Sequence, residues 1–245
     1  MLEHKPWVFL IDKPTGPTSF QMVYHVRRIL GVKKVGHAGT LDPFASGLLV
    51  VCAGRPATRL ISAIMEGEKE YLATLRLGVE TKTQDPEGAV TARSPIGRLS
   101  REQIETCLQS FRGEQEQVQP KYSALKYRGK PLYYYARKGI EVTKESRRIV
   151  IRTLVRTDDD SDLTGDEADL TVRVVCSKGT YIRTLAADIG RSLGCGAYLT
   201  QLRRTKSGCF SIEDCFPGTD FGLPDAYDRL LAGGASVDDV SKLLQ

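Results

Sequence analysis

The stretch "GHAGTLDPFASGLL", Gly36 to Leu49, holds one histidine, one aspartate, three glycines and one proline in fourteen residues. An Asp-Pro pair favours the start of a turn, and glycines allow tight backbone geometry or the close approach of a partner. By itself the pattern favours Asp42 as a turn former that caps the following segment. The alternative is that Asp42 carries chemistry, and the other motifs of the chain bear on that choice.

Composition narrows the class of protein. The chain has 245 residues, of which 41% are hydrophobic and 27% are charged, so it can form one sizeable core, or a main domain with a small appendage. The sequence contains no run of about 18 apolar residues, so no membrane span is predicted. The N-terminal residues lack the apolar region of a signal peptide. The six cysteines form no C-x-x-C pair, so we expect reduced thiols, a cytoplasmic protein and no zinc site.

Charge is distributed unevenly along the sequence. Three segments are basic, with net charges of +5 for residues 1–60, +9 for 121–157 and +5 for 178–206, whereas 207–245 carry −5. Clustered positive charge favours a polyanionic partner such as nucleic acid. The alternative is a solvated surface on which the charges cancel in space.

Periodicity and capping signals predict a mixture of strands and helices. Strands are expected over 7–14, 69–78, 147–157 and 170–179, and helices over 18–31, 100–113 and 180–194. Residues 47–54 read as strand or helix, and the acidic segment 158–169 as a loop or tight hairpin. Strands and helices do not alternate strictly, so the prediction is an α+β fold whose mixed sheet is largely antiparallel and flanked by helices and loops.

Common cofactor and hydrolase motifs are missing from the sequence. It contains no G-x-x-x-x-G-K, no G-x-G-x-x-G and no G-x-S-x-G. These patterns hold nucleotide phosphates, dinucleotides and nucleophilic serines respectively. We therefore expect no cofactor and no serine hydrolase.

Three further stretches change the interpretation of Asp42. "DKPTGPTS" (12–19) places a lysine on a rigid turn, and "CSKGTYIRTLAADIG" (176–190) places Arg183 in the first turn of a helix. "QLRRTKSG" (201–208) is basic. A loop aspartate in an enclosed pocket needs a counter-charge to stay ionised, and an arginine at a helix start can supply one.

Two more stretches are "KEY" (69–71) and "YSALKYRGKPLYYYARKG" (122–139). Together with the opening stretch and the three stretches above, they resemble the bacterial TruB family of tRNA pseudouridine synthases across residues 10–208. The resemblance implies the pseudouridine synthase fold and isomerisation of uridine 55 in the tRNA T loop. It also implies that Asp42 is the catalytic residue, either as a nucleophile or as a base that removes a sugar proton. Lys13 and Pro14 match a structural motif that lies beside the active site in the family.

The same resemblance assigns substrate contacts. His37 matches a histidine that holds the T loop open and takes the space of the flipped nucleotide, since the buried target must leave its stack. Tyr71 matches the tyrosine that stacks on the target base, and Arg183 the arginine that pairs with the aspartate. Tyr181 and Leu202 match residues that line the uracil pocket.

The basic block 121–157 contains five tyrosines among its cations, which suits RNA backbone contact and stacking. We expect Tyr122 to support the pocket, and Arg128 and Lys130 to face RNA. Residues 1–210 are predicted to form the catalytic domain, and 211–245 a tail too short for a full PUA domain, the small RNA-binding module of many family members. The expected partner is the tRNA T stem-loop, with no membrane and no guide RNA, and the protein is expected to be a monomer.

Two other classes of function stay open at the level of sequence. One is an RNA-binding or RNA-folding module whose catalysis is secondary. The other is an aspartate-dependent glycoside or nucleoside hydrolase. Such hydrolases use two carboxylates in defined roles, and the neighbourhood of Asp42 offers no obvious second one.

Overall fold

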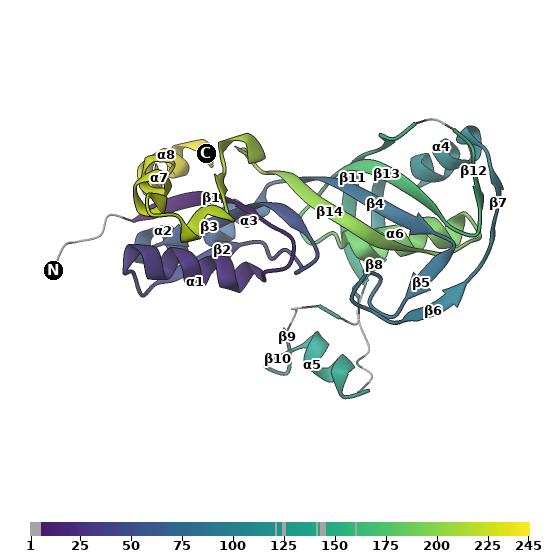
Figure 1. The fold of residues 1–245 in the computed structure, drawn as a ribbon, viewed down its shortest axis with the longest axis horizontal. Helices are drawn as coiled ribbons and strands as arrows, with labels where there is room; N and C mark the ends of the chain where they lie inside the picture. Colours follow the sequence, from purple (N-terminus) through teal and green to yellow (C-terminus); the bar gives the residue numbers. More distant parts are fainter. Residues whose placement is uncertain (1–5, 121, 124–125, 141, 143–145, 160) are drawn as a thin grey trace. The chain divides into compact units, whose positions relative to one another are not determined.

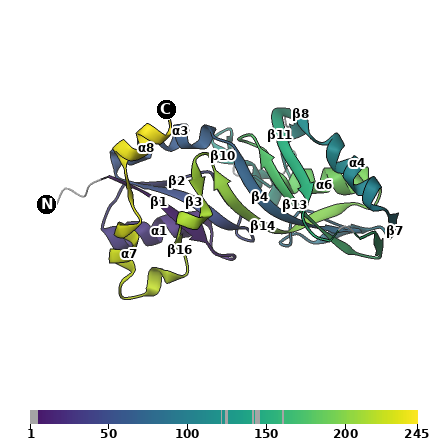
Figure 2. The same cartoon turned by 90° about the horizontal axis from the view of Figure 1, so that it is seen from above.

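The computed structural model describes residues 6–120, 122–123, 126–140, 142, 146–159 and 161–245. The chain divides into two compact units, the first formed by Met1–Leu72 with Leu202–Gln245 and the second by Ala73–Gln201. Two long strands, β4 (Lys69–Leu77) and β14 (Ala197–Ser207), run from one unit into the other. Figure 2 shows these strands side by side, in agreement with their neighbouring places in the sheet.

The first unit is built on β1 and β3. Its elements are β1 (Trp7–Lys13), α1 (Ser19–Leu30), β2 (Val35–Ala38), β3 (Ser46–Ala53), α2 (Arg55–Arg59), α3 (Ile61–Glu66), β15 (Phe210–Ser211), η1 (Ile212–Asp214), β16 (Phe216–Pro217), η2 (Asp220–Gly222), α7 (Ala226–Ala232), β17 (Ala235–Ser236) and α8 (Val237–Leu243). The helix α1 packs against β1, β2 and β3 (Figure 1).

The strand β3 resolves the ambiguous segment 47–54. It pairs antiparallel with β1 along its whole length, from Trp7↔Ala53 to Lys13↔Gly47. It also pairs antiparallel with β2 and parallel with β14. Because β3 has neighbours on both edges and is buried almost throughout, it lacks the alternation that marks a half-exposed strand.

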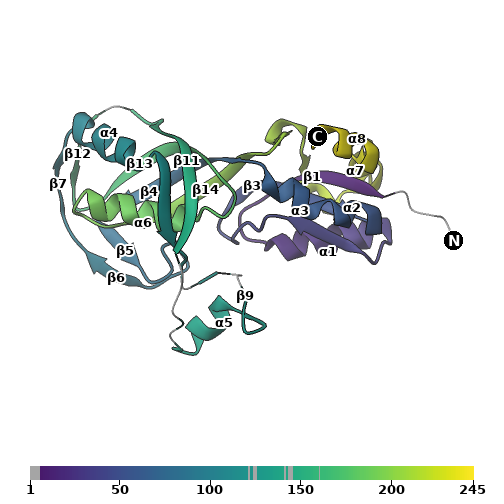
Figure 3. The same ribbon diagram turned by 180° about the vertical axis from the view of Figure 1, so that it is seen from behind.

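The second unit combines a sheet with two helices. Beyond β4 and β14 its elements are β5 (Val79–Thr81), β6 (Val90–Arg93), β7 (Ile96–Leu99), α4 (Arg101–Ser110), β8 (Gly113–Val118), β9 (Lys126–Tyr127), β10 (Lys130–Pro131), α5 (Leu132–Arg137), β11 (Ser146–Arg156), β12 (Leu163–Gly165), β13 (Ala168–Cys176) and α6 (Ile182–Ser192). The strand order is β14-β4-β13-β11-β8. Figure 3 shows α4 and α6 beside these strands, and α4 contacts both α6 and β11.

The predicted fold class is confirmed as α+β with a largely antiparallel sheet. Two helices begin at capping boxes, formed by Thr18 with Gln21 in α1 and by Ser100 with Gln103 in α4. The acidic segment 158–169 is more ordered than a plain loop, since it contributes β12, which pairs with β7. Residues 211–245 belong to the first unit, where β16 and β17 both pair with β1.

Candidate active site

The main chain of Asp42 does form a turn. The amide of Ala45 donates to the carbonyl of Asp42 at 3.1 Å, which places Pro43 at the second position of a β-turn, where its fixed φ is favoured. The carboxylate belongs to a half-buried residue on the loop between β2 and β3. Turn former and candidate chemical group are therefore compatible roles for this one residue.

The residues on either side of Asp42 are tied to the rest of the first unit. The hydroxyl of Ser19 accepts from the Leu41 amide at 2.8 Å and donates to the Leu41 carbonyl at 2.9 Å. On the other side, the Pro43 carbonyl accepts from the Gly16 amide at 2.8 Å and from Lys13 Nζ at 3.3 Å. The backbone that presents the carboxylate is thus fixed immediately before and immediately after it.

Lys13 is fully buried and its ammonium also donates to the carbonyls of Pro14 and Pro17, at 2.9 and 2.8 Å. A buried ammonium needs such acceptors because burial otherwise disfavours its charge. The lysine thereby joins the Pro-rich turn to the Asp42 loop, in keeping with the structural role that the resemblance implies.

Arg204 spans the ends of the same loop. Its side chain is buried, Nε donates to the Leu48 carbonyl at 2.7 Å and Nη2 to the Gly39 carbonyl at 3.0 Å. At Gly47, with φ of +104°, an added Cβ would lie 2.3 Å from the Arg204 carbonyl oxygen. Only glycine allows this approach, which explains one of the three glycines of the opening stretch.

His37 lies in β2, opposite Val51 of β3, and is half-buried. Burial, and secondly the positive charge of Arg204, lower the pKa of His37 below 6.5, so the imidazole is neutral at pH 7. Its Nδ1 is buried and makes no hydrogen bond within the described part of the chain. Sequence resemblance and structure agree in placing this histidine in the same unit as Asp42.

Tyr71 and Leu202 are also in the first unit, on β4 and β14, with exposed fractions of 9% and 8%. The next residue of β14, Arg203, forms a bidentate ion pair with Asp12 at 3.1 and 2.7 Å. Successive side chains of a strand point to opposite faces. Arg203 and Arg204 therefore serve different partners although they are neighbours in sequence.

Arg183 lies in the second unit and has a carboxylate partner that the sequence analysis did not identify. Its Nη1 donates to Asp85 at 3.0 Å and to the Thr83 carbonyl at 3.0 Å, and Nη2 donates to the Tyr122 carbonyl at 2.8 Å. Both side chains of the Arg183–Asp85 pair are about 95% buried. Pairing of Arg183 with Asp42 stays a prediction.

Tyr181 directly precedes α6 and is half-buried. Its main chain is held by one glutamine, since the Gln117 side chain accepts from the Tyr181 amide at 2.8 Å and donates to its carbonyl at 3.1 Å. This contact fixes the start of the helix that carries Arg183. The glutamine is nearly fully buried, with 4% exposed.

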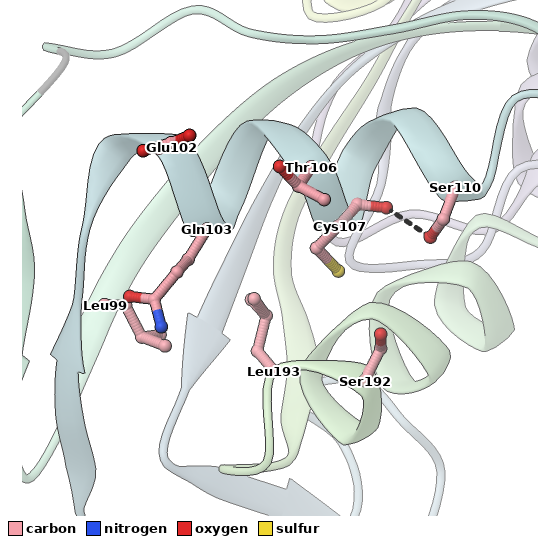
Figure 4. Close-up of a pocket in the computed structure, with 8 residues that line it drawn as sticks. All are labelled: Leu99, Glu102, Gln103, Thr106, Cys107, Ser110, Ser192 and Leu193. Atoms are coloured by element: carbon pink, nitrogen blue, oxygen red, sulfur yellow. Dashed lines mark hydrogen bonds between the residues drawn. The ribbon is translucent and has the colours of Figure 1, made fainter.

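One hollow in the described part of the second unit does not involve these motifs. A cavity of about 520 Å³ lies between α4 and α6 in the second unit (Figure 4). It is lined by Leu99, Glu102, Gln103, Thr106, Cys107, Ser110, Ser192 and Leu193. None of these is a residue that the sequence resemblance assigns to the site.

Within the described ranges, no group of three or more His, Cys, Asp and Glu side chains could hold a metal ion. Among those same residues, no helix is long and apolar enough to cross a membrane.

Comparisons with known proteins identify the family of the chain. The N-terminal domain model of the TruB family of pseudouridylate synthases matches residues 27–182, and the C-terminal domain model of tRNA pseudouridylate synthase B matches 183–222. The chain belongs to the TruB family of pseudouridylate synthases, a family of isomerases.

Two relatives give the degree of similarity. The tRNA pseudouridine synthase B of Desulfotalea psychrophila is 63% identical over 238 residues, which cover 97% of this chain and 96% of the relative. The protein of the same name from Chromobacterium violaceum is 49% identical over 211 residues, which cover 86% of this chain and 66% of the relative.

A solved structure confirms the predicted pseudouridine synthase fold. A chain in the structure of an H/ACA RNP bound to a substrate RNA containing 2′-deoxyuridine superposes with a TM-score of 0.66 and 27% identity. The match covers 97% of this chain but spans only 61% of the solved one.

Proposed function

We propose that this chain converts uridine 55 in the T loop of tRNA to pseudouridine, and that Asp42 is its catalytic residue. The observation that carries the proposal is the fixed backbone around Asp42, with Leu41 tied to Ser19 and Pro43 tied to Lys13. A side chain whose backbone is already fixed can act on the reacting atoms without the free-energy cost of ordering that backbone during the reaction.

The reaction that we propose requires only one carboxylate. The N1–C1′ bond of the uridine breaks, the uracil turns while it is held, and C5 bonds to C1′. The proton leaves C5 and N1 gains one, so no water or electron is consumed. Asp42 serves either as the nucleophile or as the base that removes a sugar proton.

We assign the remaining side chains as substrate contacts on the strength of the resemblance. Tyr71 stacks on the target base, Tyr181 and Leu202 line the uracil pocket, and His37 takes the space of the flipped nucleotide. The lowered pKa of His37 suits this role, because a neutral ring enters an RNA loop without losing the hydration of a charge.

A basic and aromatic segment supports RNA as the partner. The ammonium groups of Lys130 and Lys138 lie 4.3 and 4.7 Å from the Tyr134 ring centroid, and the Arg128 guanidinium lies 5.4 Å from that of Tyr127. Hydrogen bonds from Lys138 and Lys130 lower the pKa of Tyr134 to about 8. Exposed rings beside cations can stack on bases while the cations meet phosphates.

We further propose that the protein acts as a cytoplasmic monomer without a guide RNA, and that residues 1–210 form the catalytic region. The test uses only the purified protein and an unmodified tRNA transcript that carries tritium at uridine C5. The wild type is expected to release one label per tRNA and no free uracil.

The catalytic role of Asp42 is tested by Asp42→Asn in the same assay. Removal of a general base or nucleophile is expected to slow release by at least about 10²-fold, whereas Asp238→Asn, an exposed control on α8, keeps the wild-type rate. Tight tRNA binding by the wild type without tritium release would instead support an RNA-binding module. Release of free uracil would support a hydrolase.

A further inference from the structure

The outer face of α1 combines exposed rings with cations. Phe20 and Tyr24 are 63% and 51% exposed, and they lie four residues apart, on one face of the helix. Arg27 and Arg28 follow on the same side, and the Arg27 guanidinium lies 5.9 Å from the Phe20 ring centroid. We call this set, with Lys33 and Lys34 of the following segment, the α1 patch.

The α1 patch lies in a segment without acidic residues. Residues 13–41 contain no Asp or Glu, and α1 itself carries basic residues in its last turn. Arg28, Lys33 and Lys34 are exposed. Among the described residues, none of the four cations of the patch lies within ion-pair distance of a carboxylate.

This combination favours a nucleic-acid surface over a protein-docking surface. Aromatic residues and arginines occur at both kinds of surface, but lysines are depleted at protein–protein interfaces, and rings interleaved with several cations are typical of grooves that follow single-stranded nucleic acid. The helix α4 is a contrast within the same chain, because its Arg101 pairs with Glu105 at 3.0 Å.

The start of α1 lies beside the Asp42 loop. Ser19, the first residue of α1, holds Leu41 through two hydrogen bonds, and Phe20 is the next residue. With a rise of 1.5 Å per residue, the helix from Phe20 to Arg28 extends over about 12 Å. An RNA strand bound at Asp42 can therefore continue along this face.

We infer that the α1 patch binds the RNA strand that flanks the modified uridine, with Phe20 and Tyr24 stacking on bases and the four cations contacting phosphates. This inference rests on the proposed function, and it adds a contact surface outside the uridine pocket.

The test measures the Kd of full-length protein variants for the unmodified tRNA transcript, in parallel with tritium release. The double variant Phe20→Ser/Tyr24→Ser is expected to weaken binding by roughly 5- to 150-fold for each ring that stacks. Lys33→Glu is expected to weaken binding and to reduce the slope of log Kd against log salt by about 1. The turnover rate at saturating tRNA should stay unchanged.

Matched controls exist in the acidic segment 207–245 of the same unit. Tyr227 on α7 is 46% exposed and Lys242 on α8 is exposed, so Tyr227→Ser and Lys242→Glu are expected to bind like the wild type. Wild-type Kd values for the patch variants, or an equal loss in the controls, would overturn the inference. Failure of the wild type to release tritium would overturn the proposed function instead, because the Kd comparison does not depend on turnover.

Discussion

Arg204 donates to the carbonyl of Gly39 at 3.0 Å while its Nε donates to that of Leu48 at 2.7 Å. The two carbonyls lie before and after Asp42, so one buried side chain holds both ends of the loop that presents the carboxylate. We regard Arg204 as a positioning residue, because it acts on the main chain of the loop.

Arg204→Met should lower both stability and turnover. The substitution leaves the Gly39 and Leu48 carbonyls without this donor. The free energy of unfolding should fall by about 1–3 kcal/mol for each buried carbonyl that loses its hydrogen bond. The turnover rate should fall more than the affinity for tRNA, and Arg204→Lys should restore part of it. Arg203→Met is the control, because its half-exposed pair with Asp12 contributes about 0–1 kcal/mol. Equal unfolding free energies and equal turnover rates for the two methionine variants would refute the positioning role of Arg204.

Gly47→Ala tests the close approach to Arg204. Gly47 and Gly16 have nearly the same φ, +104° and +107°, but an added Cβ meets the Arg204 main chain at Gly47 and nothing within 4 Å at Gly16. Both alanine variants bear a backbone cost of about 1–3 kcal/mol. Only Gly47→Ala bears a further overpacking cost of about 1–3 kcal/mol, so denaturant unfolding should separate them.

The Arg183–Asp85 pair should show strong coupling in a double-mutant cycle. Each side chain is about 95% buried, so removal of one partner strands a charge and is expected to cost about 3–5 kcal/mol. The losses of unfolding free energy caused by Asp85→Ala and by Arg183→Met should therefore add up to more than the loss caused by the double variant. Strict additivity of the unfolding free energies would contradict this assignment.

The stability of the protein should decrease as the pH falls from about 7.5 to 5.5. Burial and Arg204 hold the pKa of His37 below 6.5 in the folded state, so the unfolded chain takes up protons first and is favoured by acid. His37→Gln should flatten this dependence of the unfolding free energy on pH. The pKa of His25 is lowered as well, by burial and then by Arg28, so a smaller slope should persist in the variant.

Local signals in the sequence predicted the elements better than the contacts between them. The helices expected over 18–31 and 100–113 are observed as α1 and α4, and each begins at a capping box whose two partners are only three positions apart. The role of Arg204 was missed, because burial of an arginine reverses the usual preference and depends on which face of β14 is enclosed.

Asp85 was missed for a different reason. It belongs to an Asp-Pro pair, like Asp42, and such a pair by itself indicates only the start of a turn. Its partner Arg183 is 98 positions away, and no local pattern brings two such residues together. A second Asp-Pro pair was the available signal, but it is too common in turns to stand alone.

The division of the first unit between the two ends of the chain has a consequence for biosynthesis. Arg204 is translated 162 residues after Asp42, because the whole second unit, Ala73–Gln201, lies between them. At about 5–20 residues per second, this interval is roughly 8 to 32 s. During that time the nascent chain holds the carboxylate without the strand and the guanidinium that fix its loop. A product released by premature termination before Leu202 would lack β14 beyond that point and the guanidinium that fixes the Asp42 loop, so we expect it to be inactive.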